Sequence, residues 1–300
     1  MDEKKEIKME IRKIFVVGSG LMGSGIAQTA IQAGYEVILN DQSKAALERG
    51  QAGINKRLER LVEKGRMTAE EKEDCMGRLT TSVSVHVASN VDMVIEAIYE
   101  NLEAKQAIFQ QLDKICDSRT IFASNTSSLS ITEMGNGLKH PVIGMHFFNP
   151  VPSMKLVEII RGANTTQETF DFVYKLSQEI GKEPVEVAEA PGFVVNKILI
   201  PMINEAIGLV ETGVASVADI DKAMQLGANH PMGPLALGDF IGLDVCLAIM
   251  ETLYNETGDS KYRPALLLRK MVRGGLLGKK TGKGFYVYNA DRTKTPVDAQ

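Results

Sequence analysis

Three glycines and a later carboxylate are the first residues in this chain whose types and spacing point to chemistry. Gly18, Gly20 and Gly23 follow the apolar run KIFVV in the pattern G-x-G-x-x-G, and Asp41 ends the next apolar run, EVILND. Such glycines allow a tight turn, a close approach of the backbone to a pyrophosphate and close packing of the following helix. The free N–H groups at the N-terminus of that helix attract phosphates. The predicted dinucleotide contacts are Gly18, Gly20, Leu21, Met22, Gly23 and Asp41.

The residues around Asp41 favour NAD(H) over NADP(H). We expect the Asp41 carboxylate to accept hydrogen bonds from both ribose hydroxyls, whereas a 2′-phosphate would call for a nearby arginine. Gln42, Ser43 and Lys44 follow, and the first arginine after them is Arg49. FAD-binding proteins use the same glycine pattern, but the sequence carries no second FAD signal. A glycine-rich turn without a ligand is the remaining alternative.

A histidine and a glutamate in the stretch VIGMHFFNPVPSMKLVEII form a second candidate site. Glu158 lies inside the apolar run KLVEII, 12 residues after His146. A carboxylate buried in a strand costs much free energy unless it is paired, and a histidine is a suitable partner. The pair would fix the imidazole tautomer and stabilise the imidazolium, as acid–base catalysis of hydride transfer at an alcohol carbon requires. The alternative is a core histidine bonded to the backbone and a glutamate at a solvated edge.

Two further polar positions could hold a substrate. Ser127 belongs to ASNTSSLSIT, which follows the apolar run TIFAS, and open α/β sheets bind ligands at the carboxyl ends of their strands. These hydroxyl residues could equally cap the next helix. Asn196 lies in a long apolar run, where a buried amide needs a specific partner, although that partner could belong to its own helix.

Composition narrows the class of protein. The 300 residues are 44% apolar and carry a net charge of −4, which predicts a folded protein and speaks against nucleic acid as a partner. We expect no membrane span and no secretory signal, because the apolar runs are too short or too interrupted. Cys75, Cys116 and Cys246 are odd in number and far apart. We therefore expect no disulfide framework, no metal site and a cytoplasmic location.

The catalytic candidates require an alternating fold to position them. From about residue 11 to residue 188, short apolar runs alternate with helical patterns such as the spacing of Ala104, Ile108 and Leu112. This alternation predicts an α/β fold of the Rossmann type, with a mostly parallel sheet covered on both faces. We assign residues 1–189 to this NAD-binding domain.

The pattern becomes helical after the break at Pro191. We predict a second, all-α domain at residues 190–300 that serves the substrate and dimerisation. Its first helix is apolar on most of its surface and must be buried on most of it. In a domain this small, a second subunit is the easiest cover, so we expect a homodimer. Ser216 followed by Asp219 predicts the start of a later helix.

Together these stretches resemble the 3-hydroxyacyl-CoA dehydrogenase family, in particular its bacterial members that act on 3-hydroxybutyryl-CoA. The resemblance covers nearly the whole chain, and HFFNP followed by KLVE, and PGFVVN followed by HPMGPL, are specific to the family. It implies an NAD-binding domain, a helical domain that dimerises, and reversible hydride transfer between NAD(H) and C3 of an acyl-CoA such as acetoacetyl-CoA.

The resemblance also implies roles for individual residues. His146 would be the catalytic acid/base and Glu158 its partner, while Ser127 and Asn196 would hold the 3-oxygen of the substrate. The positions expected to touch or flank the nicotinamide half of the cofactor are Glu100, Lys105, Asn149 and Lys280. A charged helical arm would lie against CoA, and the residues expected to bind the substrate are Arg57, Lys64 and Ser127.

Two other functions stay open. Related sugar-acid dehydrogenases share HFFNP-like motifs but lack a CoA-binding arm, and the basic stretch Lys56–Lys64 favours CoA. A non-catalytic NAD-binding protein would have no reason to combine all four catalytic candidates. The chain departs from the family between Ser128 and His146, where about two residues are missing in an expected surface turn near residues 135–140. It also begins with about eight extra polar residues, which we interpret as a disordered tail.

Overall fold

The computed structural model describes residues 11–289, 291 and 293–297, and the chain divides into two compact units between Glu189 and Ala190. The tail predicted to be disordered lies outside the described residues. Each unit has a hydrophobic core of its own.

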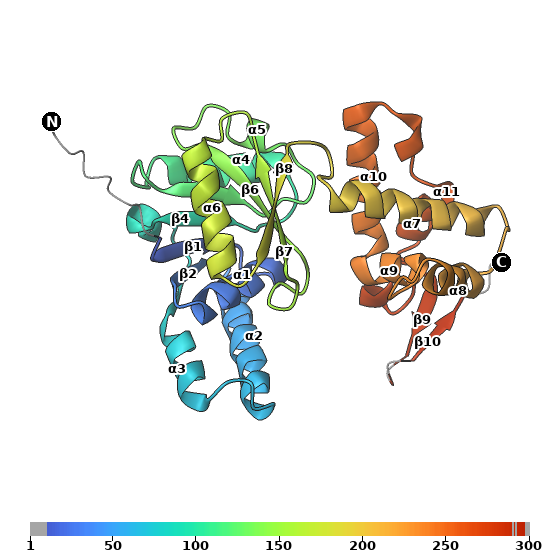
Figure 1. Cartoon of the computed structure of the whole chain (residues 1–300), viewed down its shortest axis with the longest axis horizontal. Coiled ribbons are helices and arrows are strands. Elements are labelled where there is room, and N and C mark those ends of the chain that lie inside the picture. Colours follow the sequence, from blue (N-terminus) through green and yellow to red (C-terminus); the bar gives the residue numbers. More distant parts are fainter. Residues whose placement is uncertain (1–10, 290, 292, 298–300) are drawn as a thin grey trace. The chain divides into compact units, whose positions relative to one another are not determined.

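Within the part of the chain that the structure describes, the first unit has eight strands and six α-helices (Figure 1). The strands are β1 Lys13–Val17, β2 Glu36–Asn40, β3 Leu79–Ser82, β4 Met93–Glu96, β5 Ile121–Ser124, β6 Val142–Phe147, β7 Leu156–Arg161 and β8 Glu183–Ala188. The helices are α1 Leu21–Gln32, α2 Lys44–Glu63, α3 Ala69–Gly77, α4 Leu102–Asp113, α5 Ile131–Met134 and α6 Gln167–Glu179, with a 3-10 helix, η1, at Val85–Asn90.

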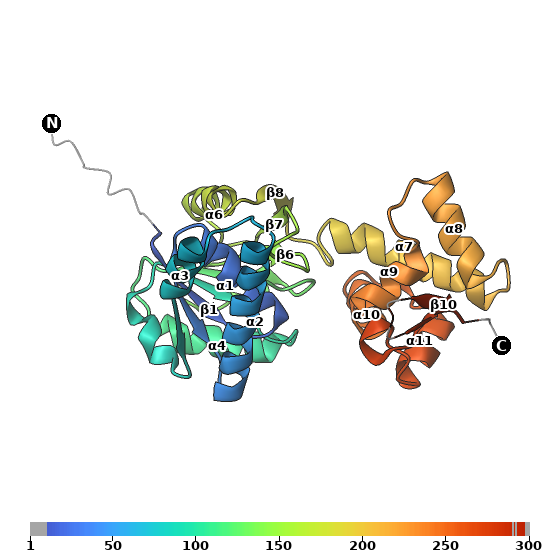
Figure 2. The same cartoon turned by 90° about the horizontal axis from the view of Figure 1, so that it is seen from below.

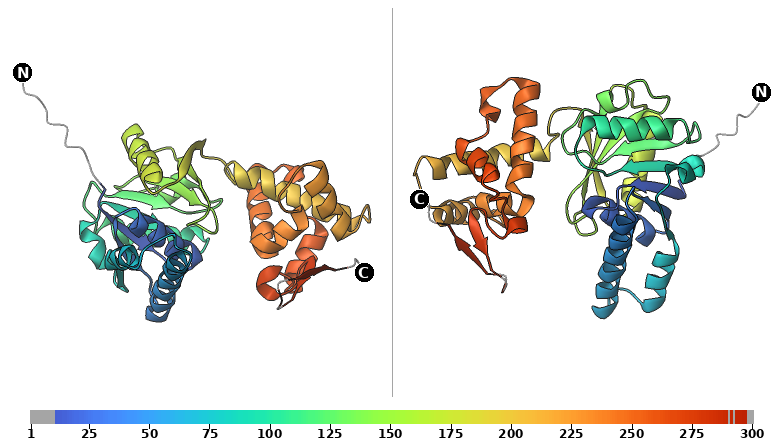
Figure 3. Two further views of the ribbon diagram at one scale, coloured as in Figure 1. Left: turned by 60° about the horizontal axis from the view of Figure 1, so that its bottom comes forward. Right: turned by 180° about the vertical axis from the view of Figure 1, so that it is seen from behind.

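All eight strands form one sheet in the order β3-β2-β1-β4-β5-β6-β7-β8. The ladders are parallel except between β6 and β7, which confirms the predicted mostly parallel sheet. The chain moves from β1 to β2 in one direction and from β4 to β5 in the other, so right-handed crossovers place α1 and α4 on opposite faces. Figure 3 shows α4 covering the face that lies behind the sheet in Figure 1.

Two of these strands carry no apolar run that could predict them. In β3, with the sequence LTTS, only Leu79 is buried, and in β8, EPVEVA, only Val187 is buried. Both strands lie at the edges of the sheet, where only part of each strand contacts the core. Their place is therefore set by the backbone ladder with a neighbouring strand and not by hydrophobic patterning.

The predicted charged arm, residues 55–65, covers the second half of α2, which extends away from the sheet together with α3 (Figure 1). Thr68 starts α3 with a capping box, since its side chain accepts from Glu71 N and the Glu71 side chain accepts from Thr68 N. An ion pair between Lys72 and Glu59 joins the two helices. The capping box and the ion pair thus fix α3 against α2.

The connection before β6 is a turn, as predicted, but its end is buried. Asn136 and Gly137 are exposed, whereas His140 is only 3% exposed. His140 Nδ1 lies 2.7 Å from Asp113 Oδ1, and that oxygen also accepts from the His140 backbone N–H at 3.0 Å. This contact anchors the turn to the end of α4 directly before the strand that carries His146.

The second unit is mainly helical, as predicted (Figure 2). Its elements are α7 Val195–Glu211, α8 Val217–Gly227, α9 Pro234–Ile241, α10 Leu243–Thr257, η2 Ser260–Tyr262, α11 Leu266–Arg273, η3 Lys279–Thr281, β9 Tyr286–Tyr288 and β10 Lys294–Pro296. The hairpin of β9 and β10 corrects the all-α prediction. Buried Asp239 holds it, accepting from Phe285 N and Tyr286 N at 2.9 Å each. A carboxylate thus fixes a hairpin too short to be stable alone.

The predicted start of α8 is confirmed, since the Ser216 hydroxyl accepts from Asp219 N at 3.2 Å. The apolar helix predicted after Pro191 is α7, which continues through Pro201. Among the described residues, no helix combines the length and the apolar character needed to cross a bilayer.

Candidate active site

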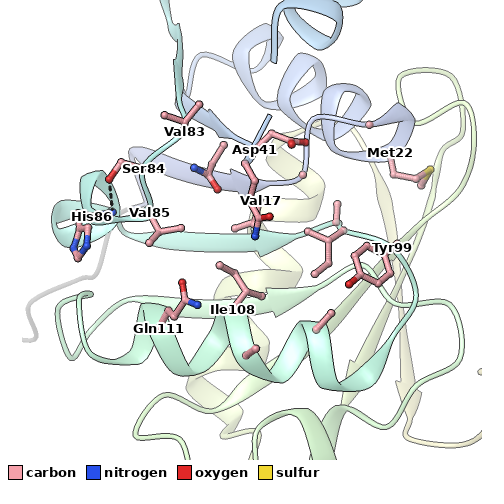
Figure 4. A pocket seen from close by; sticks show the side chains of 18 of the residues that line it. Val17, Met22, Asp41, Val83, Ser84, Val85, His86, Tyr99, Ile108 and Gln111 are labelled. Carbon is pink, nitrogen blue, oxygen red and sulfur yellow. Dashed lines mark hydrogen bonds between the residues drawn. The ribbon is translucent and has the colours of Figure 1, made fainter. Parts of the chain in front are cut away.

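A cleft of about 870 Å³ opens at the carboxyl ends of β1, β2 and β4. Figure 4 shows Asp41 on one side of it and Ile108 and Gln111 of α4 on the other, with His86 at one end and Tyr99 at the opposite end. Ligands bind at this edge of open α/β sheets, where the strand order reverses. The cleft is long, two-sided and mostly apolar, which suits an extended nucleotide.

Helix α4 forms one wall of the cleft. The spacing of Ala104, Ile108 and Leu112 predicts a helix, which α4 confirms, and Ala104 and Ile108 line the cleft. The buried residues of α4 are Lys105, Phe109 and Leu112. The helix is therefore turned so that a lysine takes a core position, which hydrophobic spacing alone does not predict.

The glycine turn at the base of the cleft has the geometry that its sequence requires. Gly18 has a φ of +97°, and a Cβ there would lie 2.5 Å from the carbonyl oxygen of Ala97. A Cβ at Gly23 would collide with the Gly18 carbonyl oxygen, whereas one at Gly20 would meet no protein atom within 4 Å. Protein packing thus requires the first and third glycines, and the second leaves open space where a phosphate fits.

Asp41 is held as an ionised acceptor at the rim of the cleft. Its Oδ2 accepts from the backbone N–H of Ser19 at 3.0 Å and from the Ser19 hydroxyl at 2.8 Å, and its Oδ1 accepts from Ser43 N at 3.0 Å. Burial raises the pKa of Asp41, but these hydrogen bonds outweigh it, so the pKa lies below its usual value. Ser19, which is not among the predicted site residues, therefore fixes the carboxylate.

His146 and Glu158 face each other across the antiparallel pair β6 and β7. The two residues are directly opposite in register, and His146 Nδ1 lies 2.7 Å from Glu158 Oε2. His146 is 4% exposed and Glu158 is 1% exposed. A carboxylate can only accept here, so Nδ1 carries the hydrogen, and Nε2 is left as the nitrogen that can exchange a proton.

Ser127 lies in a turn after β5 that a carboxylate organises. Glu100 Oε1 accepts from the Thr126 hydroxyl at 2.6 Å, from Ser127 N at 2.7 Å and from Ser128 N at 3.2 Å. The neighbouring Asn125 Oδ1 accepts from Phe147 N at 2.9 Å. The turn is thereby tied to the end of the strand that carries the histidine.

A buried ion pair lies behind this turn, and the sequence prediction contained only part of it. Lys105 was expected at or beside the cofactor, but its side chain is 1% exposed and its Nζ lies 2.7 Å from Glu96 Oε1 and 3.3 Å from Glu100 Oε2. Glu96, at 0% exposure, was not predicted as a functional residue. These contacts favour a supporting role for Lys105 over direct contact with a ligand.

The predicted CoA residues on α2 have different environments. The Arg57 guanidinium donates to Gln28 Oε1 at 2.5 Å and to the Ser24 carbonyl oxygen at 3.3 Å, so it attaches α2 to α1. These contacts favour a structural role for Arg57, and its role toward CoA stays a prediction. Lys64, at the end of α2, is exposed, as are Lys56 and Arg60 at the preceding four-residue intervals. Four-residue spacing places these three cations along one side of the helix.

Three predicted residues fall outside the groups above. Asn149 follows β6 and is exposed. Asn196 lies in the first turn of α7, and Lys280 donates to Asp244 Oδ2 at 2.6 Å. Asn196 and Lys280 belong to the second unit, and their roles stay predictions.

Comparisons with known proteins agree along the chain. The family model described as 3-hydroxyacyl-CoA dehydrogenase, NAD binding domain, matches residues 13–190, and the model of the C-terminal domain of that family matches residues 192–288. The 3-hydroxybutyryl-CoA dehydrogenase of Clostridioides difficile is 53% identical over 92% of this chain and 99% of its own length. A probable 3-hydroxybutyryl-CoA dehydrogenase of Bacillus subtilis is 55% identical over 93% of this chain and 98% of its own.

A solved structure is similar in fold as well as in sequence. The crystal structure of (S)-3-hydroxybutyryl-CoA dehydrogenase PaaH1 from Ralstonia eutropha superimposes with a TM-score of 0.90 at 49% identity, covering 93% of this chain and all of that one. Two matching domain models and relatives of about half-identical sequence over nearly the full length leave one assignment. This chain belongs to the 3-hydroxyacyl-CoA dehydrogenase family.

Proposed function

We propose that this protein is an NAD-dependent dehydrogenase that interconverts short-chain 3-oxoacyl-CoA and (S)-3-hydroxyacyl-CoA, with acetoacetyl-CoA and 3-hydroxybutyryl-CoA as its pair. The observation that carries the proposal is the buried contact of His146 Nδ1 with Glu158. This pair lies on β6 and β7 of the same sheet whose strand β1 leads into the glycine turn for a dinucleotide. The names of the most similar relatives support the choice of substrate.

NAD(H) would supply or accept the hydride at the substrate's C3. The cleft fits such a group: the turn leaves space at Gly20, and Asp41 is held as an acceptor for ribose hydroxyls. An ionised Asp41 would repel a 2′-phosphate, and Gln42, which also lines the cleft, offers no compensating charge. These features support NAD(H) over NADP(H).

His146 would act as the acid and base at the 3-oxygen. In reduction its Nε2 donates a proton to the oxygen, and in oxidation Nε2 removes the proton from the hydroxyl. Glu158 keeps Nδ1 protonated and stabilises the imidazolium form. Ser127, in the turn tied to β6, would donate to the same oxygen as charge develops on it. Asn196 keeps its predicted role as a second donor.

The CoA group would lie along the arm. Lys56, Arg60 and Lys64 line one side of α2 and are exposed, so their charges can meet the phosphates of CoA. Arg57 is left out of this proposal, because its guanidinium bonds to Gln28 and Ser24.

The second unit supports a homodimer. Two apolar side chains on α7 are exposed, Ile198 at 68% and Leu209 at 42%, and Val214, shortly after the helix, is 67% exposed. Apolar groups gathered along one helix are typical of a subunit interface. We also propose the cytoplasm as the compartment, which the free thiols of Cys75 and Cys116 support.

One assay tests the proposed function. Absorbance of the reduced nicotinamide is followed with acetoacetyl-CoA, using NADH and NADPH in parallel and a free 3-oxo acid in place of the thioester. We expect rapid oxidation of NADH and much slower oxidation of NADPH. Turnover of the free acid but not the thioester would favour the sugar-acid alternative, and no turnover of either would favour a non-catalytic protein.

The role of His146 is tested in the same assay. The variant His146→Gln removes the group that exchanges the proton, so turnover should fall by about 10² to 10⁴. NADH binding, measured by nucleotide fluorescence, should stay close to that of the unmodified protein. Turnover near the original rate would rule out this residue as the acid/base.

A further inference from the structure

Glu96 is the centre of a fully buried ionic cluster that the proposed mechanism does not use. It is the last residue of β4, with a side chain that is 0% exposed. Lys105 and Ser124, which contact it, are 1% and 0% exposed. Burying a carboxylate and an ammonium away from water is costly, and an apolar group would pack at the end of a strand as well. The charges therefore call for a functional explanation.

The contacts of Glu96 join two segments of the site. Its Oε1 accepts from Lys105 Nζ at 2.7 Å and from Ile98 N at 2.7 Å, and Ile98 lines the cofactor cleft. Its Oε2 accepts from the Ser124 hydroxyl at 2.5 Å, and that hydroxyl accepts from Thr126 N at 3.2 Å. One carboxylate thus holds both the wall of the cleft and the start of the turn that carries Ser127.

The Glu96 carboxylate also affects which groups Glu100 contacts. Glu100 uses Oε1 for three donors of the turn, the Thr126 hydroxyl and the N–H groups of Ser127 and Ser128. Its Oε2 lies 3.3 Å from Lys105 Nζ, a longer contact than that of Lys105 with Glu96. With Glu96 as its nearer partner, the lysine leaves Glu100 available to the turn.

We propose that Glu96 is a positioning residue, which retains Lys105 so that Glu100 can hold the Ser127 turn in register with the cofactor wall at Ile98. The proposal rests on the proposed function for its effect on turnover. If the charge of Glu96 is removed, Lys105 becomes a buried cation whose remaining carboxylate partner among the described contacts is Glu100. The strong pull of an underpaired buried ammonium should then draw Glu100 away from the turn.

The experiment compares Glu96→Gln with the double variant Glu96→Gln/Lys105→Met, which removes both charges together. Exposed Glu103 on α4 provides the control variant Glu103→Gln. We expect Glu96→Gln to lower kcat with acetoacetyl-CoA by about 10- to 100-fold, as small displacements in an active site do. KM should change much less. The double variant should recover most of kcat, because Glu100 is again free to hold the turn, and the control should match the unmodified protein.

A second measurement does not depend on the substrate. Hydrogen exchange of the amides of Ser127 and Ser128 should be faster in Glu96→Gln and restored in the double variant. Absence of turnover in the unmodified protein would count against the proposed function, while this exchange pattern would still support the role of Glu96. If Glu96→Gln does not fold, Glu96→Asp replaces it, since a shorter carboxylate keeps the charge but loses reach, and the same two losses are expected. Unchanged kcat and exchange in a folded variant, a loss of stability alone, or a double variant no better than the single one would each overturn the proposal.

Discussion

Replacing Glu158 by glutamine is the sharpest test of the histidine–carboxylate pair. The two side chains have the same shape, so the change removes one charge and leaves the packing of β7 intact. Glu158 is 1% exposed, and its Oε2 lies 2.7 Å from His146 Nδ1. A glutamine can also present its NH₂ group to Nδ1, which would place the ring hydrogen on Nε2, the nitrogen that has to exchange a proton.

The size of the effect follows from the distance and the burial. With charge centres about 4 Å apart and an effective dielectric constant of about 20, the carboxylate stabilises an imidazolium by about 4 kcal/mol. Each 1.36 kcal/mol is about tenfold in rate, which gives close to 10³-fold. A neutral glutamine retains a weak dipolar contact, so we expect Glu158→Gln to lower kcat by about 10² to 10³.

The assay is NAD⁺ reduction with 3-hydroxybutyryl-CoA at saturating cofactor, the direction in which the imidazolium forms, with thermal unfolding measured in parallel to identify misfolded protein. Glu186→Gln is the matched control, because Glu186 lies on the neighbouring strand β8 with its side chain 53% exposed. The control should keep its activity, and both variants should bind NADH. A folded Glu158→Gln protein with kcat within about threefold of the original would refute the reasoning, since such a loss equals less than 1 kcal/mol.

Three further predictions concern the cofactor, the fold and the CoA arm. Ser19→Ala removes one hydrogen bond to Asp41 and should weaken NADH binding by about three- to tenfold by fluorescence titration; unchanged affinity would contradict it. Burial raises the pKa of Asp113, but hydrogen bonds from a buried histidine and nearby amides keep it below its usual value, so its stabilisation is present above about pH 4 and is lost as pH falls through the folded pKa. Asp113→Asn should therefore lower the free energy of unfolding in urea by about 1–2 kcal/mol near pH 7 and by less near pH 3. An equal loss at both pH values would contradict this explanation. Arg57→Ala should lower the melting temperature without raising KM for the CoA thioester, whereas Lys64→Ala should raise KM without lowering the melting temperature. A raised KM in Arg57→Ala at an unchanged melting temperature would indicate that Arg57 binds CoA.

The cofactor half of the site could be predicted because its requirements are local. A tight turn with φ near +97° at Gly18 and a colliding Cβ at Gly23 restrict the residue type directly, so the pattern survives in the sequence. Ser19 could not be singled out in this way. A serine between two glycines has many explanations, and only the folded turn brings its N–H and hydroxyl onto Asp41.

The edges of the sheet escaped prediction for the opposite reason. Hydrophobic patterning reports burial, and β3 and β8 bury one side chain each, Leu79 and Val187. The central strands β1 and β4 are buried almost throughout and were visible as apolar runs. Backbone hydrogen bonds, which fix an edge strand, place no demand on side-chain type. A strand held in this way leaves little trace in composition.

The two buried carboxylates of the sheet were open to the same reasoning, yet only one was found. Glu158 in KLVEII drew attention because a charge inside an apolar strand needs a partner and a histidine lay nearby. Glu96 in VDMVIEAI sits in the same kind of run, so it too required a cation. Its partner, Lys105, lies on a helix, where a lysine is normally solvent-exposed, and the apolar spacing of that helix does not include it. A carboxylate inside a buried strand is therefore the stronger signal, because a buried acid predicts a buried base even on a helix where a lysine would normally face solvent.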